Sequence, residues 1–206
     1  MTDNLTEEEV NEIANKKRRK HKEAKDKILA TKTKEGGLLI VHTGKGKGKT
    51  TAALGMVARV IGHGKNVGIV QFVKGKWETG ERVVLEAFPD QVTMTAMGEG
   101  FTWENQNRAR DIEAAEAAWI RAKEMIQDPK NSLVLLDEIN IVLRNDYLPI
   151  EEVVNFLKTK PANVHVICTG RNAKLELIEA ADLVTEMTEV KHHFRAGYKA
   201  QTGIEF

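Results

Sequence analysis

The chain has 206 residues, with 31 basic and 30 acidic side chains and a formal net charge of +1. This length suits one α/β domain with a substantial core, and the balanced charge provides no global field that would attract nucleic acid or a membrane. Cys168 is the only cysteine, so no intrachain disulfide can form and a reducing compartment is the simpler interpretation. The polar N-terminus and the lack of a long apolar stretch lead us to expect a cytoplasmic protein without a membrane segment.

Residues 1–35 predict a charged helix. Thr6 followed by Glu9 fits a capping box, and glutamates fill the first turn before the basic run 16–20, an order that complements the helix dipole. Apolar positions are few, so such a helix can bury little and should lie on the surface or cover a ligand or partner. Glycines then separate it from the main body, and we expect two parts, 1–35 and 36–206.

From residue 38 onward the pattern alternates between strand and helix. Buried, β-branched strands in repeated strand–helix units predict a mostly parallel sheet with helices on both faces. Ligands bind such sheets at the carboxyl ends of the strands. The expected strands are 38–42, 66–73, 92–97, 132–136, 164–168 and an edge strand 183–187, and the expected helices are 49–61, 82–88, 104–127, 150–157 and 173–180.

The segment HTGKGKGKTTAAL, residues 42–54, lies between an expected strand and an expected helix. Glycines allow backbone N–H groups to converge on phosphate oxygens, and a helix N-terminus favours anions. A standard phosphate loop has glycine five residues before Gly48, where this chain has Thr43, yet the Gly48-Lys49-Thr50 core is intact. The alternative is an ordinary glycine-rich turn, in which Lys45 and Lys47 are simply solvated. The expected nucleotide-binding residues of this loop are Thr43, Gly44, Lys45, Gly46, Lys47, Gly48, Lys49, Thr50 and Thr51.

Asp137 and Glu138 directly follow the most hydrophobic expected strand. An acidic residue at the end of a buried strand can hold Mg²⁺, either directly or through water, and the Thr50 hydroxyl can be a further ligand. In a hydrolase the neighbouring glutamate can instead activate water. A plain polar strand terminus is the structural alternative.

Phe101 and Trp103 are two residues apart in a segment flanked by glycines. In an extended segment both rings point to the same side, so they can close over a flat apolar ligand. Alternatively, the two rings form a hydrophobic staple that packs against the start of the following helix. On the residue pattern alone, the staple is the favoured interpretation.

Several charged residues have no decided role. Arg59 on the loop helix can face the nucleotide, and Lys74 and Arg171 at strand ends can reach anionic groups, but an ordinary surface charge is at least as good an interpretation of each. His192 and His193 lack cysteine or acidic residues at metal-site spacing and indicate a loop.

Six separated segments together resemble the P-loop ATP:corrinoid adenosyltransferases, which act on cob(I)alamin or cob(I)yrinic acid a,c-diamide. The resemblance runs from about Gly37 to Phe206. The segments, in chain order, are Thr43-Gly-Lys-Gly-Lys-Gly-Lys-Thr-Thr51, Gln71-Phe-Val-Lys-Gly75, Gly100-Phe-Thr-Trp-Glu104, Leu136-Asp-Glu-Ile-Asn140, Thr169-Gly-Arg-Asn172 and the tail Arg195-Ala-Gly-Tyr-Lys-Ala-Gln-Thr-Gly-Ile-Glu-Phe206.

The resemblance implies a three-layer RecA-like P-loop fold with a six-stranded, mostly parallel sheet, and a homodimer. It implies transfer of the 5′-deoxyadenosyl group of ATP to the Co(I) of a corrinoid, with release of triphosphate, in adenosylcobalamin biosynthesis or salvage. In this family ATP binds in a reversed sense, so that the ribose 5′ carbon faces the corrin. The alternation of glycine and lysine is the family's own form of the loop.

The resemblance also implies roles for individual residues. Thr50 and Glu138 match the ligands of Mg²⁺ (or Mn²⁺), with Asp137 either touching the metal or supporting Glu138. Lys49 helps to stabilise the leaving triphosphate, and Arg59 matches an arginine that contacts the nucleotide.

The aromatic pair gains a role in the same way. Phe101 and Trp103 match the rings that close under the corrin and displace its lower axial ligand, which reverses the preference for a packing staple. The implied partners are a flavodoxin-type electron donor and a second subunit, and the N-terminal helix is implied to cover the bound corrinoid.

Two other functions compete with this one. A RecA-like ATPase or kinase would use Asp137 and Glu138 to activate water. A nucleotide-dependent binding module would contact nucleic acid with the basic helix 16–27, although the near-neutral total charge counts against it.

Overall fold

The structure is a computed structural model that describes residues 6–73, 80–96 and 107–204. The chain divides into two compact units, Met1–Glu35 and Gly36–Phe206. The first unit is helix α1, Glu7–Ala30, and the predicted capping box is present: the Thr6 hydroxyl accepts from the Glu9 N–H and the Glu9 carboxylate accepts from the Thr6 N–H. No residue of α1 is buried within its unit, so its role as a cover stays a prediction.

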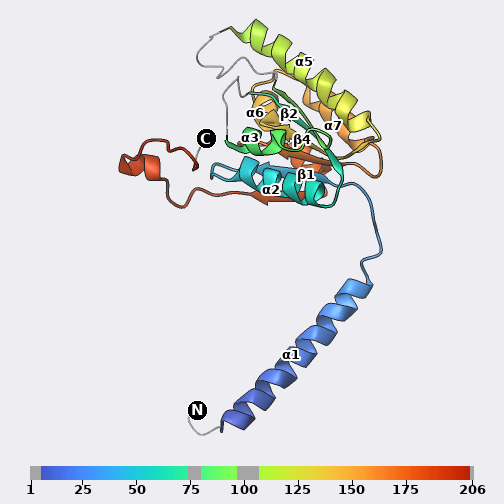
Figure 1. Cartoon of the computed structure of the whole chain (residues 1–206), viewed down its shortest axis with the longest axis vertical. Helices are drawn as coiled ribbons and strands as arrows, with labels where there is room; N and C mark the ends of the chain where they lie inside the picture. Colours follow the sequence, from blue (N-terminus) through green and yellow to red (C-terminus); the bar gives the residue numbers. More distant parts are fainter. Residues whose placement is uncertain (1–5, 74–79, 97–106, 205–206) are drawn as a thin grey trace. The chain divides into compact units, whose positions relative to one another are not determined.

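The second unit contains a six-stranded sheet in the order β3-β2-β4-β5-β1-β6, and every strand pair is parallel (Figure 1). β6 lies at one edge, as predicted. This architecture confirms the predicted α/β class, a three-layer RecA-like P-loop fold. The strands are β1 (Leu39–Thr43), β2 (Asn66–Gln71), β3 (Val92–Ala96), β4 (Asn131–Asp137), β5 (His165–Thr169) and β6 (Leu183–Glu186).

The helices follow the predicted order with different boundaries. α5 begins at Arg108 because the Asn107 side chain caps it by accepting from the Arg110 N–H. α6 was not predicted, since six residues are too few to show a helical period. Among the described residues, no helix is both long enough and apolar enough to span a bilayer. The helices of this unit are α2 (Lys49–Gly62), α3 (Gly80–Glu86), α5 (Arg108–Gln127), α6 (Ile139–Arg144), α7 (Ile150–Lys158), α8 (Leu175–Ala180) and a 3₁₀ helix η1 (His193–Ala196).

Side chains of the central strands alternate between two apolar cores, one on each face of the sheet. In β4, Leu133 and Leu135 pack with α2 and α3, whereas Val134 and Leu136 pack with α5, α7 and α8. A stretch of strand that is packed on both faces is usually apolar without alternation, which explains the continuous apolar run Leu133 to Leu136 in the middle of β4. Packing in the two cores aligns β1, β2, β4 and β5, so that their carboxyl ends lie along the same side of the sheet, which we call its carboxyl edge.

His165 is the first residue of β5, at the end of the sheet opposite the carboxyl edge, and it holds the start of β1 in place. Its Nδ1 accepts the Leu38 N–H at 3.1 Å, which requires a neutral ring. Burial lowers the pKa of His165 below its ordinary value, and the nearby charges of Lys160 and Lys65 lower it further. The Lys160 ammonium also donates to the Gly37 carbonyl beside it.

We therefore expect the stability of the protein to decrease as the solution is acidified. Because the folded-state pKa of His165 is lowered, the unfolded chain binds the proton more readily, and the contribution of His165 is present above pH 6.5 and lost as pH falls through the folded-state pKa. His165→Asn should keep an acceptor for Leu38 without titrating. Urea unfolding at pH 7.5 and 5.5 should show a smaller loss for the variant, and an equal loss in both proteins would contradict the expectation.

Candidate active site

Polar side chains end four neighbouring strands at one edge of the sheet. Thr43 ends β1, Gln71 ends β2, Asp137 ends β4 and Thr169 ends β5. Because parallel strands finish at the same edge, these residues come together although they are far apart in sequence.

The predicted strand–loop–helix arrangement is present at this edge, with residues 44–48 joining β1 to α2. Gly48, at φ 100°, is the N-cap of α2, and it supplies no side-chain hydrogen bond to the first turn. The free N–H groups of that turn remain available to an anion. Lys49 is buried, 7% exposed, and its ammonium donates to the Gly46 carbonyl.

Four charged groups around the loop influence one another. Burial lowers the pKa of Lys49, and the charges of Arg171 and Lys47 also lower it, whereas Glu138 raises it. A polyphosphate bound here would supply the negative charge that favours protonated Lys49.

The first two glycines of the loop serve close packing against the segment after β6. A Cβ on Gly44, at φ 95°, would lie 2.4 Å from the Met187 oxygen, and a Cβ on Gly46 would lie 2.7 Å from the Thr188 oxygen. The Gly46 N–H donates to the Met187 carbonyl at 2.7 Å, and the Met187 N–H donates to the Thr43 carbonyl at 2.9 Å. These glycines were expected to bring backbone N–H groups to phosphate, but the Gly46 N–H is hydrogen-bonded within the protein in this conformation.

Thr43 has a role of its own at the position where a standard loop has glycine. It is 6% exposed, and its hydroxyl accepts the Ala173 N–H at 2.9 Å. Thr43 therefore ties the phosphate loop to the segment after β5, which carries Arg171. Lys45 and Lys47 are exposed beside it.

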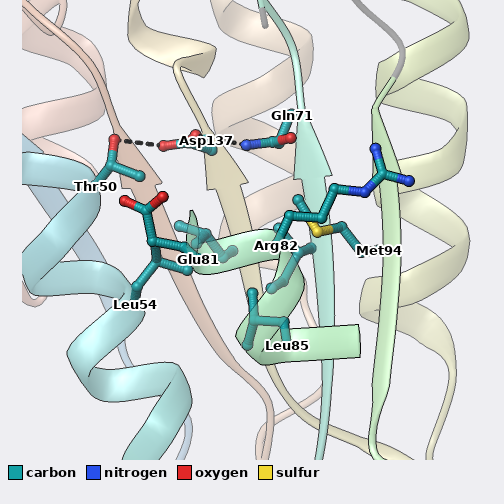
Figure 2. Close-up of a pocket in the computed structure, with 10 residues that line it drawn as sticks. Thr50, Leu54, Gln71, Glu81, Arg82, Leu85, Met94 and Asp137 are labelled. Carbon is teal, nitrogen blue, oxygen red and sulfur yellow. Dashed lines mark hydrogen bonds between the residues drawn. The ribbon is translucent and has the colours of Figure 1, made fainter. Parts of the chain in front are cut away.

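The Asp137 carboxylate is the centre of a hydrogen-bond network (Figure 2). Its Oδ1 accepts from the Thr50 hydroxyl at 2.8 Å, and its Oδ2 accepts from the Gln71 side-chain amide at 3.4 Å. The Thr169 hydroxyl, which Figure 2 does not draw, also donates to Oδ1, at 2.7 Å. Asp137 is 1% exposed, so protein donors occupy the carboxylate. Since the Thr50 hydroxyl donates its hydrogen bond to Asp137, the lone pairs of the Thr50 oxygen stay available to a cation.

Glu138 adopts the left-handed conformation, at φ 65° and ψ 16°, which costs about 1–2 kcal/mol for a residue with a side chain. Its N–H donates to the Thr169 hydroxyl at 3.0 Å. Gly170 leaves room for its carboxylate, because a Cβ there would lie 3.0 Å from the Glu138 Oε2. Asn140, fully buried, donates to the carbonyls of His42 at 3.2 Å and Gly170 at 3.0 Å. The ends of β1 and β5 are thereby tied to the turn that carries Glu138.

The oxygen donors at this edge fit Mg²⁺. The Thr50 hydroxyl and the Glu138 carboxylate are hard ligands beside the phosphate loop, and Mg²⁺ usually combines one or two such protein ligands with water and substrate phosphates. Over the described ranges, no group of three or more His, Cys, Asp or Glu residues is arranged to hold a metal.

Not every predicted site residue comes to this edge. Arg59 is exposed in the last turn of α2, about 14 Å along the helix from Thr50. Lys74, Phe101 and Trp103 lie outside the described residues, so their predicted roles stay predictions.

The sequence argument missed four residues of the site. Gln71 and Thr169 could have been found by the signal that identified Asp137, a polar residue at the end of a buried strand. Asn140 is the only amide within the apolar stretch of α6. Glu81 of α3, which lines the pocket beside Thr50 and Asp137 (Figure 2), has no local sequence signal.

A glycine-rich loop between β1 and α2, with a buried lysine and an acidic pair at the end of β4, defines a P-loop nucleotide-binding protein of the α/β class. Residues 35–206 match the family model described as ATP:corrinoid adenosyltransferase BtuR/CobO/CobP. The chain belongs to this family, and it is an enzyme of the transferase class.

Curated relatives match about nine-tenths of the chain. It is 60% identical to a corrinoid adenosyltransferase of a Sinorhizobium species, over 91% of this chain and 88% of the relative. It is 48% identical to the corrinoid adenosyltransferase CobA of Salmonella typhimurium, over 92% of this chain and 96% of the relative. Among solved structures, the KaiC-like protein PH0186 of Pyrococcus horikoshii is 18% identical and gives a TM-score of 0.47, with 76% of this chain and 75% of that chain covered.

Proposed function

We propose that this enzyme transfers the 5′-deoxyadenosyl group of ATP to the Co(I) of a corrinoid and releases triphosphate. The observation that carries the proposal is the buried Lys49 and the half-buried Thr50 beside Asp137 and Glu138, in a chain that is 60% identical to a corrinoid adenosyltransferase. The variant loop supports it further, since its glycine and lysine alternation is the form that the resemblance implies.

In this reaction the electron pair of Co(I) forms a bond to the 5′ carbon of ATP. The bond between that carbon and the triphosphate oxygen breaks, and its electrons leave on triphosphate. Co(I) is a strong nucleophile, so the protein needs no nucleophile or general base of its own. The chain has to orient the 5′ carbon, exclude water and stabilise the negative charge that develops on the leaving group.

Lys49 and the N–H groups of the first turn of α2 are the donors best placed for the triphosphate, and Lys47 and Arg171 add positive charge at the same place. Thr50 and Glu138 would hold Mg²⁺, and Asp137 would act as the acceptor that directs the lone pairs of Thr50 toward it. Bound Mg²⁺ would neutralise charge on the triphosphate. Arg59 lies too far along α2 for the phosphates, so we assign it to the nucleoside part of ATP.

The finer features of the proposal come from the resemblance. They are a homodimer, a flavodoxin-type reductant, a cytoplasmic location and a cover formed by α1 over the corrinoid. The few large apolar side chains of α1, Val10, Ile13, Ile28 and Leu29, are exposed within its own unit and support the last of these, because they leave the helix with a surface to place on another molecule.

An anaerobic incubation with MgATP and a chemically reduced Co(I) corrinoid tests the proposal. We expect the cobalt–carbon product, seen by its absorption spectrum and its sensitivity to light, in equal amounts with triphosphate. Steady release of inorganic phosphate without corrinoid would show a hydrolase instead and would refute the transfer reaction.

Phe101 and Trp103 are assigned to displacement of the lower axial ligand of the corrinoid. Loss of that ligand makes Co(II) easier to reduce, so Phe101→Ala and Trp103→Ala should slow turnover from Co(II) at least about 10-fold. Chemically pre-reduced Co(I) should restore most of the rate. Variants that are equally slow with both forms of cobalt would indicate a role in binding and not in ligand displacement.

A further inference from the structure

The segment after β6, residues 187–204, forms an arm with an unusual surface; we call it the C-terminal arm. Four of its large apolar side chains are strongly exposed: Val190 by 94%, Phe194 by 70%, Tyr198 by 60% and Ile204 by 73%. Large apolar side chains this exposed, gathered on one short segment, are a candidate binding surface. The resemblance covers this tail, yet the site described above leaves it without a role.

The arm starts at the phosphate loop, and its end lies beside the first turns of α2. At its start, Met187 exchanges backbone hydrogen bonds with Thr43 and Gly46. At its end, Gly203 and Ile204 line a groove together with Thr51 and other residues of α2 and α3. Figure 1 shows the arm, in red, leaving the body after β6 and turning back toward it. The arm therefore belongs to the edge of the sheet where the nucleotide would bind.

The polar residues of the arm restrict what it can bind. Lys191, His193, Arg195 and Lys199 bring N–H donors between the apolar side chains, and Glu189, which pairs with Arg195 at 2.6 Å, is the only acidic residue of the arm. A suitable ligand has apolar faces and a rim of hydrogen-bond acceptors. A corrinoid has both, because its macrocycle is flat and its edge carries amide side chains.

We propose that the C-terminal arm is a wall of the corrinoid site, an inference that rests on the proposed adenosyl transfer. Val190, Phe194 and Tyr198 contact the apolar surface of the macrocycle, and the arm's donors bind its amide carbonyls. The position follows from the chemistry: cobalt must come within about 3–3.5 Å of the ATP 5′ carbon before the bond forms. A surface that is hydrogen-bonded to the phosphate loop at its start and lies beside α2 at its end is correctly placed to hold the second substrate there.

A second copy of the chain is a weaker candidate for this surface. A stable interface usually involves roughly 20–30 residues from each partner. The arm is shorter than that, and its large apolar side chains are separated by polar ones. A subunit contact therefore becomes one outcome of the test.

The test is a titration of the full-length protein with cob(II)alamin, followed by EPR, beside a titration with MgATP followed by calorimetry. The double variant Phe194→Ala/Tyr198→Ala should bind cob(II)alamin at least about 10-fold more weakly and MgATP within about 2-fold of wild type. Because both side chains are mostly exposed, the melting temperature should be unchanged. Ile120→Ala, which truncates a side chain of α5 that is 55% exposed, is the matched control and should bind both ligands normally.

Three results would overturn or redirect the inference. Unchanged cob(II)alamin affinity in the double variant would refute it. Loss of a dimer in sedimentation, with cobalamin affinity lost only at concentrations where the dimer dissociates, would assign the arm to a subunit interface. If wild-type protein fails to bind cob(II)alamin at all, the proposed function itself fails, and this outcome differs from a wild type that binds and a variant that does not.

Discussion

Lys49→Met is expected to lower kcat/KM for MgATP by about 10²–10³-fold, which is the usual cost of removing one preorganised donor from a developing anion. Methionine keeps the length and the apolar stem of lysine, so the buried position can still be filled. The variant lacks the Lys49 ammonium, so the loop loses this positive charge. A variant with near-normal kcat/KM would show that the triphosphate is held elsewhere.

The pH dependence of the wild-type enzyme supplies a second measurement on the same residue. Burial and the neighbouring cations lower the pKa of Lys49 in the free protein, so its ammonium begins to deprotonate below pH 10.5. Affinity for triphosphate should therefore decrease as pH rises through that lowered pKa. Lys49→Arg should flatten this decrease because a guanidinium stays charged, and calorimetric titrations with triphosphate between pH 7 and 10 would show it.

Most of the overall fold was predictable because most of its helices and strands have a local sequence signal. The middle of β4, Leu133 to Leu136, is apolar at every position because it is buried on both faces, and Gly48-Lys49-Thr50 lies between a strand and a helix whose patterns are clear. Helix α6 could not be predicted, since its six residues are shorter than two helical turns and follow a strained residue, Glu138.

The candidate site was only partly predictable, since long-range contacts determine much of it. Gly44 and Gly46 were correctly placed in the loop, but their close contacts with Met187 and Thr188 depend on the pairing of β1 with β6, which no local pattern reveals. The network around Asp137 likewise depends on β5 lying between β1 and β4. Sequence patterns identify the groups that carry charge, and the sheet order decides which neutral residues orient them.

Thr169 is the neutral residue with the largest expected effect. Its hydroxyl donates to the Asp137 Oδ1 at 2.7 Å and accepts the Glu138 N–H at 3.0 Å, so one side chain fixes both acidic residues. Asp137 in turn orients the Thr50 hydroxyl. Thr169→Val keeps the shape of the side chain but leaves the Glu138 N–H without this acceptor and Asp137 without one of its donors.

We expect Thr169→Val to weaken Mn²⁺ binding in the presence of ATP by about 10–100-fold, the usual effect of removing a group that orients a metal ligand. EPR of free Mn²⁺ measures this affinity without any corrinoid, and kcat should decrease in parallel. Thr169→Ser retains the hydroxyl and should restore most of the affinity, whereas a purely structural loss would lower the melting temperature without a specific change in Mn²⁺ affinity. Wild-type Mn²⁺ affinity in the valine variant would show that Asp137 and Glu138 are held in place without Thr169.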